Sequence, residues 1–474
     1  MRILCITFLM LLTLIFAGTV TAQEQILDEV NDYLVIREII ILGNRVTKPG
    51  IIERELLFNR GDTIKKMELI PAIQRSRENL LNTSLFNFVF FDANHYPEDR
   101  IDILISVTER WYIWPVPILE LADRNLSTFL KNKEWDRINY GMWLKWNNFR
   151  GRREVLTGKL RLGYKKEYAL TYSIPNMGKR QQHGFSTGFA INDQSELNYT
   201  TLNNVPVYYN EGKGHSHYKQ EAFASYTYRR KFYVTHQIKF DYNLFAVSDS
   251  VLILNPDYLG NGDAKLRFFS LGYLFEHDLR DSKIYPMDGY AFKFKAQQCG
   301  LGIFEDFRYP HLKLTGTFFY HQRLDSRLYF GNATKAQFST QKELPYVFKK
   351  ALGYYENLSG YEYYVIDGTD YFLTKYYLKF ELLKQRTSTI PFIKMEQFNK
   401  IHYALYINIF ADAGYVYNGM TDPTNTMTND WQFSTGIGLD IVTYYDQVFR
   451  IEYAINRLGE GGIFVNIETP FRRW

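Results

Sequence analysis

Residues 403–414 read YALYINIFADAG, and two different surfaces alternate along this stretch. The odd-numbered positions form an apolar face that consists of Tyr403, Leu405, Ile407, Ile409 and Ala411. The even-numbered positions form a mixed face that consists of Ala404, Tyr406, Asn408, Phe410 and Asp412. Because successive side chains of a β-strand point to opposite sides, this pattern predicts a strand with one face in apolar surroundings.

The same alternation recurs in segments spread over residues 111–474, for example over residues 375–382 and 448–455. A soluble β-sandwich has the same period, but it needs far fewer strands than this chain supplies. A closed membrane barrel explains the pattern, because backbone N–H and C=O groups in hydrocarbon must all be paired. We therefore expect an all-β transmembrane antiparallel barrel of about 16 strands.

The composition fits such a barrel. The chain has 38 Tyr and 36 Phe, yet its mean hydropathy is only −0.30. Alternation hides the hydrophobicity of membrane strands from any averaging window. The net charge of +5 over 474 residues is modest and argues against nucleic acid as a partner. On composition alone, a soluble all-β protein remains an alternative.

Residues 1–22 have the features of a secretory signal peptide. Arg2 supplies the basic start, an apolar run follows, and residues 20–22, VTA, form a small-x-small cleavage pattern. An anchoring helix is the alternative, but the apolar core is short and polar residues follow it at once. Cleavage would remove Cys5 and leave Cys299 alone, so an intrachain disulfide is excluded. Residues 23–34 then form a short exported tail.

Residues 35–110 show a different period and predict a small α+β domain with the order β-α-α-β-β. A β-branched strand at 35–42 precedes a short helix that ends near residue 58 and a second helix at about 65–82. Residues 86–91 and 101–107 predict a hairpin joined by a polar stretch at 93–100. No cluster in this domain resembles a catalytic site.

Several short motifs resemble those of one family. They are ILGN at residues 41–44, NNFRGR at 147–152, YSIP at 172–175, DLRD at 278–281, YPMDGY at 285–290 and FADAG at 410–414. Together they resemble the barrel-assembly superfamily of BamA/TamA-like proteins, in which periplasmic POTRA domains precede an outer-membrane barrel. The resemblance implies one POTRA domain at 35–110 and a barrel at 111–474.

Residues 352–383 occupy the position of that family's sixth extracellular loop. In the family an R-G-F/Y tip folds into the lumen, and its arginine meets the Asp of the F-x-D-x-G strand. Here Gly360 and Tyr361 match, Ser359 replaces the arginine, and Asp412 is retained. A serine cannot supply the contact of a guanidinium. Asp412 then pairs with another lumenal cation, for which Lys379 and Arg450 are the candidates. A hydrated Asp412 without a special partner, or a loosely held loop, is the alternative.

The resemblance also places the first barrel strand at about residues 112–121 and the last at 463–471. Pro115 and Pro117 are two residues apart, so their missing N–H groups would face the same neighbour and weaken one side of the strand. In the family this seam can open laterally and template an incoming strand. Alternatively, the prolines mark a connector before the barrel. The expected seam residues are Trp114, Pro115, Pro117, Val465, Ile467 and Pro470.

The resemblance implies a non-enzymatic factor that assembles outer-membrane proteins, with the POTRA domain in the periplasm. Unfolded clients would pair with the POTRA edge strand at Phe86, Phe88 and Phe90. The other implied partners are the outer-membrane bilayer and lipoprotein subunits. The alternatives are a secretion pore for one exported protein and an accessory barrel without insertase activity. His215 and His217 could bind a metal but lie in a polar loop sequence, so we expect no metal site and no cofactor.

Overall fold

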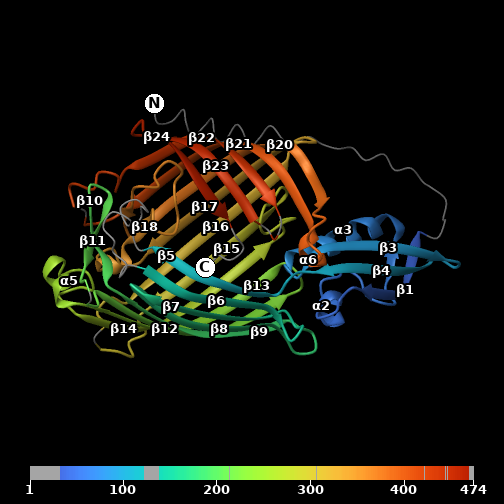
Figure 1. Ribbon diagram of the computed structural model, residues 1–474, viewed down its shortest axis with the longest axis horizontal. Helices are drawn as coiled ribbons and strands as arrows, with labels where there is room; N and C mark the ends of the chain where they lie inside the picture. Colours follow the sequence, from blue (N-terminus) through green and yellow to red (C-terminus); the bar gives the residue numbers. More distant parts are fainter. Residues whose placement is uncertain are drawn as a thin grey trace.

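The computed structural model describes residues 32–121 and 138–468, apart from residues 213, 306, 421, 444 and 446. The predicted signal peptide, most of the predicted tail and Pro470 lie outside these ranges. The chain forms a small N-terminal domain at one end of a large barrel (Figure 1). Within the described ranges, no helix is long and apolar enough to cross a membrane.

The N-terminal domain is a four-stranded sheet with two helices against it. Its elements are β1 (Tyr33–Leu42), α2 (Pro49–Glu53), β2 (Thr63–Lys65), α3 (Lys66–Asn82), β3 (Phe86–Tyr96) and β4 (Arg100–Glu109). The strand order is β2-β1-β4-β3, with β1 parallel to β4 and β3 antiparallel to it. Apolar residues of α3 and the sheet, including Leu80, Ile36 and Ile103, form its buried core.

Two boundaries differ from the sequence prediction. The first helix ends at Glu53 rather than near residue 58, because Leu56 and Phe58 enter the core from a loop. The stretch at 93–100 is strand except at a tight turn, where Glu98 and Asp99 adopt positive φ angles of 64° and 53°. The polar composition of this stretch reflects an exposed hairpin end rather than a long loop.

The barrel is one antiparallel sheet of 16 strands, which confirms the predicted fold class. Its strands are β5 (Ile113–Leu121), β6 (Ile138–Phe149), β7 (Glu154–Gly163), β8 (Lys165–Met177), β9 (His183–Gln194), β12 (His217–Arg230), β13 (Val234–Val247), β14 (Lys265–Asp278), β15 (Gly289–Cys299), β16 (His311–Arg323), β17 (Leu328–Ser339), β20 (Asp370–Thr389), β21 (Lys400–Tyr417), β22 (Trp431–Thr443), β23 (Gln447–Asn456) and β24 (Gly461–Glu468). Shorter elements lie in the connections: β10 (Glu196–Leu202), β11 (Val205–Asn210), α5 (Asp249–Leu254), the 3-10 helix η2 (Tyr346–Phe348), β18 (Lys350–Leu352), β19 (Ile366–Asp367) and α6 (Glu396–Asn399).

The two faces of the strands separate as the alternation predicts. In β21, Ile409 is 56% exposed on the outside, whereas Asp412 is 3% exposed on the inside. The same holds for β23, where Phe449 and Ile451 point outward and Glu452 is buried within. An outer apolar face and a polar interior are the surfaces that a barrel in lipid requires.

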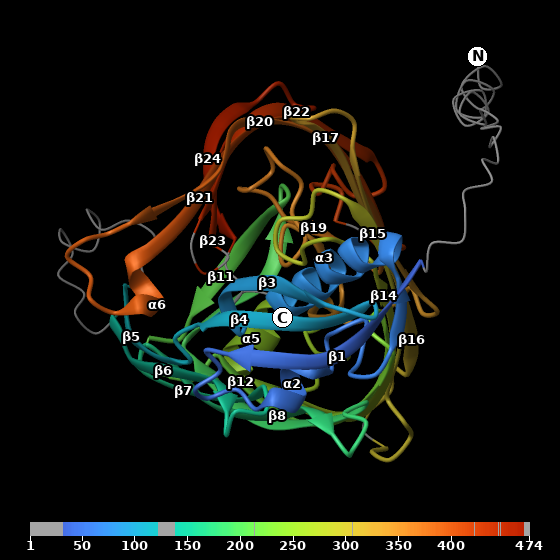
Figure 2. The same cartoon turned by 90° about the vertical axis from the view of Figure 1, so that its right-hand side faces the viewer.

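The N-terminal domain lies across one mouth of the barrel, which we call the domain-side end (Figure 2). The backbone N–H of Lys48 donates to the carbonyl of Gly151, in the turn between β6 and β7, at 2.9 Å. Asn82 at the end of α3 exchanges hydrogen bonds with Asp281 and Lys283, in the turn between β14 and β15. The domain is therefore fixed to turns on different sides of the mouth.

Candidate functional site

The connection between β17 and β20 folds into the lumen, and its tip contacts the inner wall of the barrel. The backbone N–H of Ser359 donates to Asp412 Oδ2 at 3.1 Å. Asn456 Nδ2 donates to the carbonyl of Gly360 at 2.9 Å, and the Tyr361 hydroxyl donates to the carbonyl of Phe433 at 3.1 Å. The tip thus binds β21, β22 and β23 at once. The structure brings Ser359, Gly360, Tyr361 and Asp412 together.

Glycines allow this close approach. Gly360 has a φ angle of +81°, which favours glycine. A Cβ at Gly414, the last residue of the FADAG motif, would lie 2.6 Å from Leu358 Cδ1. The missing side chain of Gly414 therefore creates the space that the buried Leu358 fills.

The cation beside Asp412 is Lys375, which the sequence prediction did not select. Its Nζ lies 3.3 Å from Asp412 Oδ2, and the two residues are directly opposite on β20 and β21. Lys379 instead lies over the ring of Tyr285, 3.9 Å from its centroid. Arg450 binds Asp440, with Nε 2.7 Å from Oδ1. The expected pairing of Asp412 with either residue is therefore wrong, because cross-strand register decides the partner.

Removal of the Lys375 charge should release the loop tip. Lys375→Met leaves the buried Asp412 carboxylate without its cation. Removal of one partner of a buried ion pair typically lowers stability by roughly 3–5 kcal/mol. Hydrogen exchange at residues 358–361 should rise strongly, whereas Lys293→Met, which removes a half-exposed lumenal lysine, should not change it.

The replaced arginine provides a second test of the same contact. Ser359→Arg should not tighten the loop of the otherwise unchanged protein, because Lys375 already neutralises Asp412. In the Lys375→Met background it should restore protection, since Asp412 Oδ1 has no hydrogen-bond partner among the described residues. Equal effects in both backgrounds would contradict this assignment.

The seam lies between β5 and β24, the two ends of the 16-stranded sheet. Within residues 113–121 and 461–468, no backbone pairing joins these strands. We expected the first and last strands to meet, and in these ranges they do not. Val465 is 66% exposed on β24, and Ile467 pairs in register with Phe449 of β23.

The prolines of β5 weaken its free edge. In the ladder with β6, Pro115 is opposite Leu144 and Pro117 is opposite Met142. A proline donates no hydrogen bond, so this continuous ladder uses the N–H groups of the residues between the prolines. The nitrogens of Pro115 and Pro117 therefore face the seam. Two absent donors remove roughly 0.5–1.5 kcal/mol of net pairing each.

Four aromatic residues, which we call the aromatic clasp, join both sides of the seam at the domain-side end. They are Trp111, Trp114, Phe398 and Tyr445. Phe398 belongs to α6, in the connection between β20 and β21, and its ring centroid lies 6.2 Å from that of Trp114. The ring centroids of Trp114 and Tyr445 lie 5.1 Å apart. The Tyr445 hydroxyl accepts a hydrogen bond from the backbone N–H of Trp111 at 3.0 Å. The clasp therefore connects the start of β5 across the seam, where no backbone pairing between residues 113–121 and 461–468 does so.

Loss of the Phe398 ring should loosen the first strand. Aromatic pairs contribute about 0.5–1.5 kcal/mol each. Phe398→Ala removes contacts with Trp111, Trp114 and Tyr445, on the order of 2 kcal/mol, so amide exchange in β5 should accelerate roughly 30-fold. Phe392→Ala, at the exposed tip of the same connection, is the matched control. Unchanged exchange in β5 of Phe398→Ala would show that the clasp does not hold this strand.

The predicted client-pairing strand lies at the edge of the N-terminal sheet, but only part of it is accessible. Phe86 is fully buried in the core. The ring of Phe88 packs edge-on against that of His402, with 6.4 Å between the ring centroids. Asn87 Nδ2 donates a hydrogen bond to the carbonyl of Gln397 at 3.1 Å. Phe90 is 54% exposed. The available edge therefore begins near Phe90, and Phe86 is a core residue.

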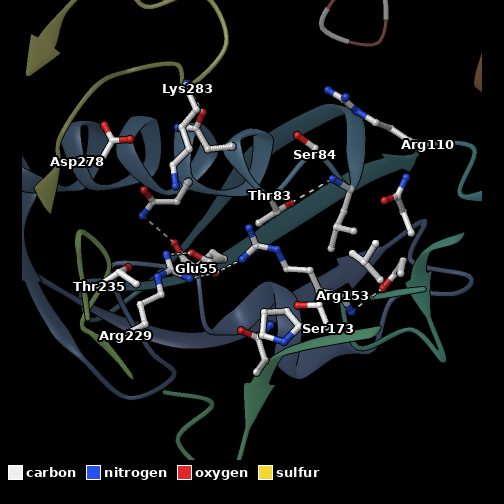
Figure 3. A pocket seen from close by; sticks show the side chains of 18 of the residues that line it. Glu55, Thr83, Ser84, Arg110, Arg153, Ser173, Arg229, Thr235, Asp278 and Lys283 are labelled. Atoms are coloured by element: carbon white, nitrogen blue, oxygen red, sulfur yellow. Dashed lines mark hydrogen bonds and ion pairs between the residues drawn. The ribbon is translucent and has the colours of Figure 1, made fainter. Parts of the chain in front are cut away.

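A buried carboxylate fastens the N-terminal domain to the barrel (Figure 3). Glu55 lies 2.7 Å and 2.9 Å from the two terminal nitrogens of Arg229, on β12. Arg54 and Arg153 lie 2.9 Å and 3.6 Å from the same carboxylate. Burial raises the pKa of Glu55, but the arginines, with Arg229 foremost, outweigh burial and lower it to about 2. This ion cluster combines residues from both domains.

Docking of the domain should therefore weaken in acid. The pKa of Glu55 falls from 4.5 to about 2 in the docked state, so its contribution is complete above pH 4.5 and is lost as the pH falls towards 2. A pKa shift of this size corresponds to a contribution of about 3 kcal/mol to the free energy of docking. Glu55→Gln should loosen docking at neutral pH, whereas Glu53→Gln, at an exposed neighbour, should not. Spin-label distances between domain and barrel would measure this, and a Glu55→Gln protein docked like the wild type would refute it.

A single α+β domain docked on an antiparallel barrel, with one loop bound inside the lumen, defines the class of POTRA-containing barrels. Residues 148–457 match the family model described as the Omp85 superfamily domain, and residues 34–110 match the POTRA model described as a surface antigen variable number repeat. The chain belongs to the Omp85 superfamily, whose barrels are outer-membrane proteins.

Solved structures share this fold. BamA from Haemophilus ducreyi lacking POTRA domains 1-3 is 14% identical, with a TM-score of 0.51 over 92% of this chain and 85% of that chain. CdiB from Escherichia coli is 12% identical, with a TM-score of 0.55 over 92% of this chain and 75% of that chain. No curated protein matches. At these identities, the likeness concerns the fold.

Proposed function

We propose that this protein is an outer-membrane assembly factor that inserts unfolded barrel proteins at its seam. Over residues 113–121 and 461–468, no backbone pairing joins β5 to β24, and this is the observation that carries the proposal. Each unpaired backbone group in hydrocarbon costs several kcal/mol, and an incoming strand would satisfy a row of them. Strand addition of this kind needs neither ATP nor a cofactor, and we propose no enzymatic activity.

The POTRA domain would face the periplasm and receive clients there. Its accessible edge from Phe90 onward supports pairing with an extended chain. Because β4 leads into β5, a client held on the POTRA edge would be close to the first barrel strand. Lipoprotein subunits are further candidate partners.

A secretion pore for one exported protein is the second candidate. The lumen would have to clear before any chain could thread it, because the loop tip binds three strands of the wall and the POTRA domain spans the mouth. Insertion at the seam requires neither movement, which favours the assembly factor. An accessory barrel without insertase activity is the third candidate. Ser359 in place of the family's arginine supports it, but Lys375 supplies a positive charge beside Asp412.

Depletion followed by quantitative proteomics of the outer membrane separates these functions. An assembly factor predicts that many barrel proteins fall together, whereas loss of one exported protein would identify a secretion pore. An unchanged outer membrane would favour the accessory barrel.

Complementation with a variant whose seam can be closed by a disulfide bond tests whether insertion takes place there. In a Cys299→Ser background, cysteines at Trp114 and Val465, or at neighbouring registers, should join β5 to β24 on oxidation. The oxidised protein should fail to restore barrel levels and should recover after reduction, while each single-cysteine variant should work throughout. Full activity of a verified crosslinked protein would overturn insertion at the seam.

A further inference from the structure

Strands β20 and β21 continue beyond the barrel wall at the domain-side end, where residues 384–402 form a projecting arm. β17 pairs with β20 as far as Phe380, and β22 pairs with β21 as far as Tyr403. Beyond these points β20 and β21 pair with each other, as far as Thr389 and Lys400. The arm projects sideways past the wall of the barrel, beside β5 (Figure 2).

The tip of the arm is apolar and exposed. The backbone N–H of Ile393 donates to the carbonyl of Ile390 at 3.2 Å, which places Pro391 and Phe392 at the corners of a tight turn. Phe392 is 84% exposed, the highest value among the large hydrophobic side chains of the described residues, and Met395 is 45% exposed. Turns in water usually carry Gly, Asn, Asp or Ser beside proline. The tip therefore indicates apolar surroundings.

The opposite side of the arm is bound to the rest of the protein. The carbonyl of Gln397 accepts hydrogen bonds from Asn87 Nδ2 of the POTRA domain at 3.1 Å and from the Tyr445 hydroxyl at 3.2 Å. Phe398 packs within the aromatic clasp. These contacts hold the arm from both the POTRA domain and the barrel, so its tip presents Phe392 from a fixed position.

The arm begins at the edge of the lipid-facing band. The outward faces of β20 and β21 remain apolar as far as Leu382, which is 43% exposed, and Tyr403. The aromatic clasp, to which Phe398 of the arm belongs, lies at the same end of the barrel. In outer-membrane barrels, aromatic residues gather at the level of the lipid headgroups. An arm that runs sideways from this level would lie along the surface of the adjacent leaflet.

Basic residues flank the apolar tip. Residues 384–402 contain Lys384, Arg386, Lys394 and Lys400, against one acidic residue, Glu396. Lys384, Arg386 and Lys394 are exposed. Apolar side chains beside basic ones bind membrane surfaces, because the first enter the acyl boundary and the second attract anionic headgroups. Lysine is depleted at interfaces between proteins. The composition of the arm therefore favours a lipid surface over a protein partner.

We propose that the tip of this arm inserts into the leaflet of the outer membrane next to the domain-side end, beside the seam. Phe392 and Met395 enter the acyl region, and the basic residues bind the headgroups of anionic phospholipids. Stable membrane binding needs two such signals together. Because Phe398 of the same arm contacts Trp111 and Trp114, the arm connects this leaflet to the start of β5. This inference does not depend on insertase activity.

Fluorescence quenching in the full-length protein tests the proposal. In the Cys299→Ser background, Phe392→Cys, Ile409→Cys and Glu98→Cys each carry an environment-sensitive fluorophore, in nanodiscs of phosphatidylcholine and phosphatidylglycerol. Ile409, on the outward face of β21, is the lipid reference. Glu98, in the turn between β3 and β4 on the side away from the barrel, is the water reference (Figure 1). We expect the label at 392 to be quenched by a spin-labelled phospholipid and protected from iodide, as at 409.

A second comparison tests the basic residues. With the label at 392, Lys384→Gln combined with Lys394→Gln should shift its distribution from lipid towards water, about fivefold for each lysine. Replacement of phosphatidylglycerol by phosphatidylcholine should act in the same direction. Lys265→Gln, at the opposite end of β14, should have no effect.

The outcomes separate the possible occupants of the tip. Lipid quenching at 392 that depends on phosphatidylglycerol and on the two lysines supports the proposal. Lipid quenching that depends on neither supports insertion of the apolar tip but overturns the recognition of anionic headgroups. Access of iodide to 392 as at 98 overturns insertion. Protection from both quenchers would show that a protein surface covers the tip, and it would overturn lipid as the occupant.

Discussion

Inside a membrane, an unpaired backbone N–H or C=O group costs several kcal/mol, and the architecture of this protein follows from that constraint. It requires the apolar strands to form a single sheet that curves around a polar interior. It also makes the edges of β5 and β24 the most costly part of the barrel. Pro115 and Pro117 lower the number of hydrogen bonds that β5 could form with β24, so the sequence itself weakens closure of the barrel between residues 113–121 and 461–468.

A barrel with a weak seam needs other means to keep its shape. The loop tip supplies one on the inner wall, where Ser359, Gly360 and Tyr361 connect β21, β22 and β23. These are the strands next to the seam on the β24 side. The aromatic clasp stabilises the opposite side, at the start of β5. Both devices use contacts outside the strand ladder, so they leave the edges themselves unoccupied.

Periodicity was enough to predict the barrel and the direction of its faces, and the length of the alternating segment predicted about 16 strands. It placed Asp412 inside because a two-residue repeat assigns every position of a strand to one side. It could not identify Lys375 as the partner of Asp412. That choice depends on the register of β20 against β21, and a connection of ten residues with two register shifts separates the paired segments.

Contacts between distant segments were also beyond sequence reasoning. Glu55 follows a short helix and has no local signal of burial, because Arg153 and Arg229 reach it from other parts of the chain. Phe398 lies in an irregular connection, where an aromatic residue carries no periodic pattern. The motif residues behaved differently: the amide of Asn148 in NNFRGR donates to Thr47 Oγ1 of the POTRA domain at 2.8 Å. The motif could be recognised, but its contact required the fold.

The linker between the two domains is short enough to couple their motions. β4 ends at Glu109 and β5 begins at Ile113. The residues between them are anchored in the POTRA domain: the Arg110 N–H donates to the carbonyl of Leu85 at 2.9 Å, and the Tyr112 hydroxyl donates to the same carbonyl at 3.0 Å. Because these linking residues are fixed to the POTRA domain, a rotation of that domain would move the start of β5 with it. Force applied to the POTRA domain would therefore displace the first strand of the barrel.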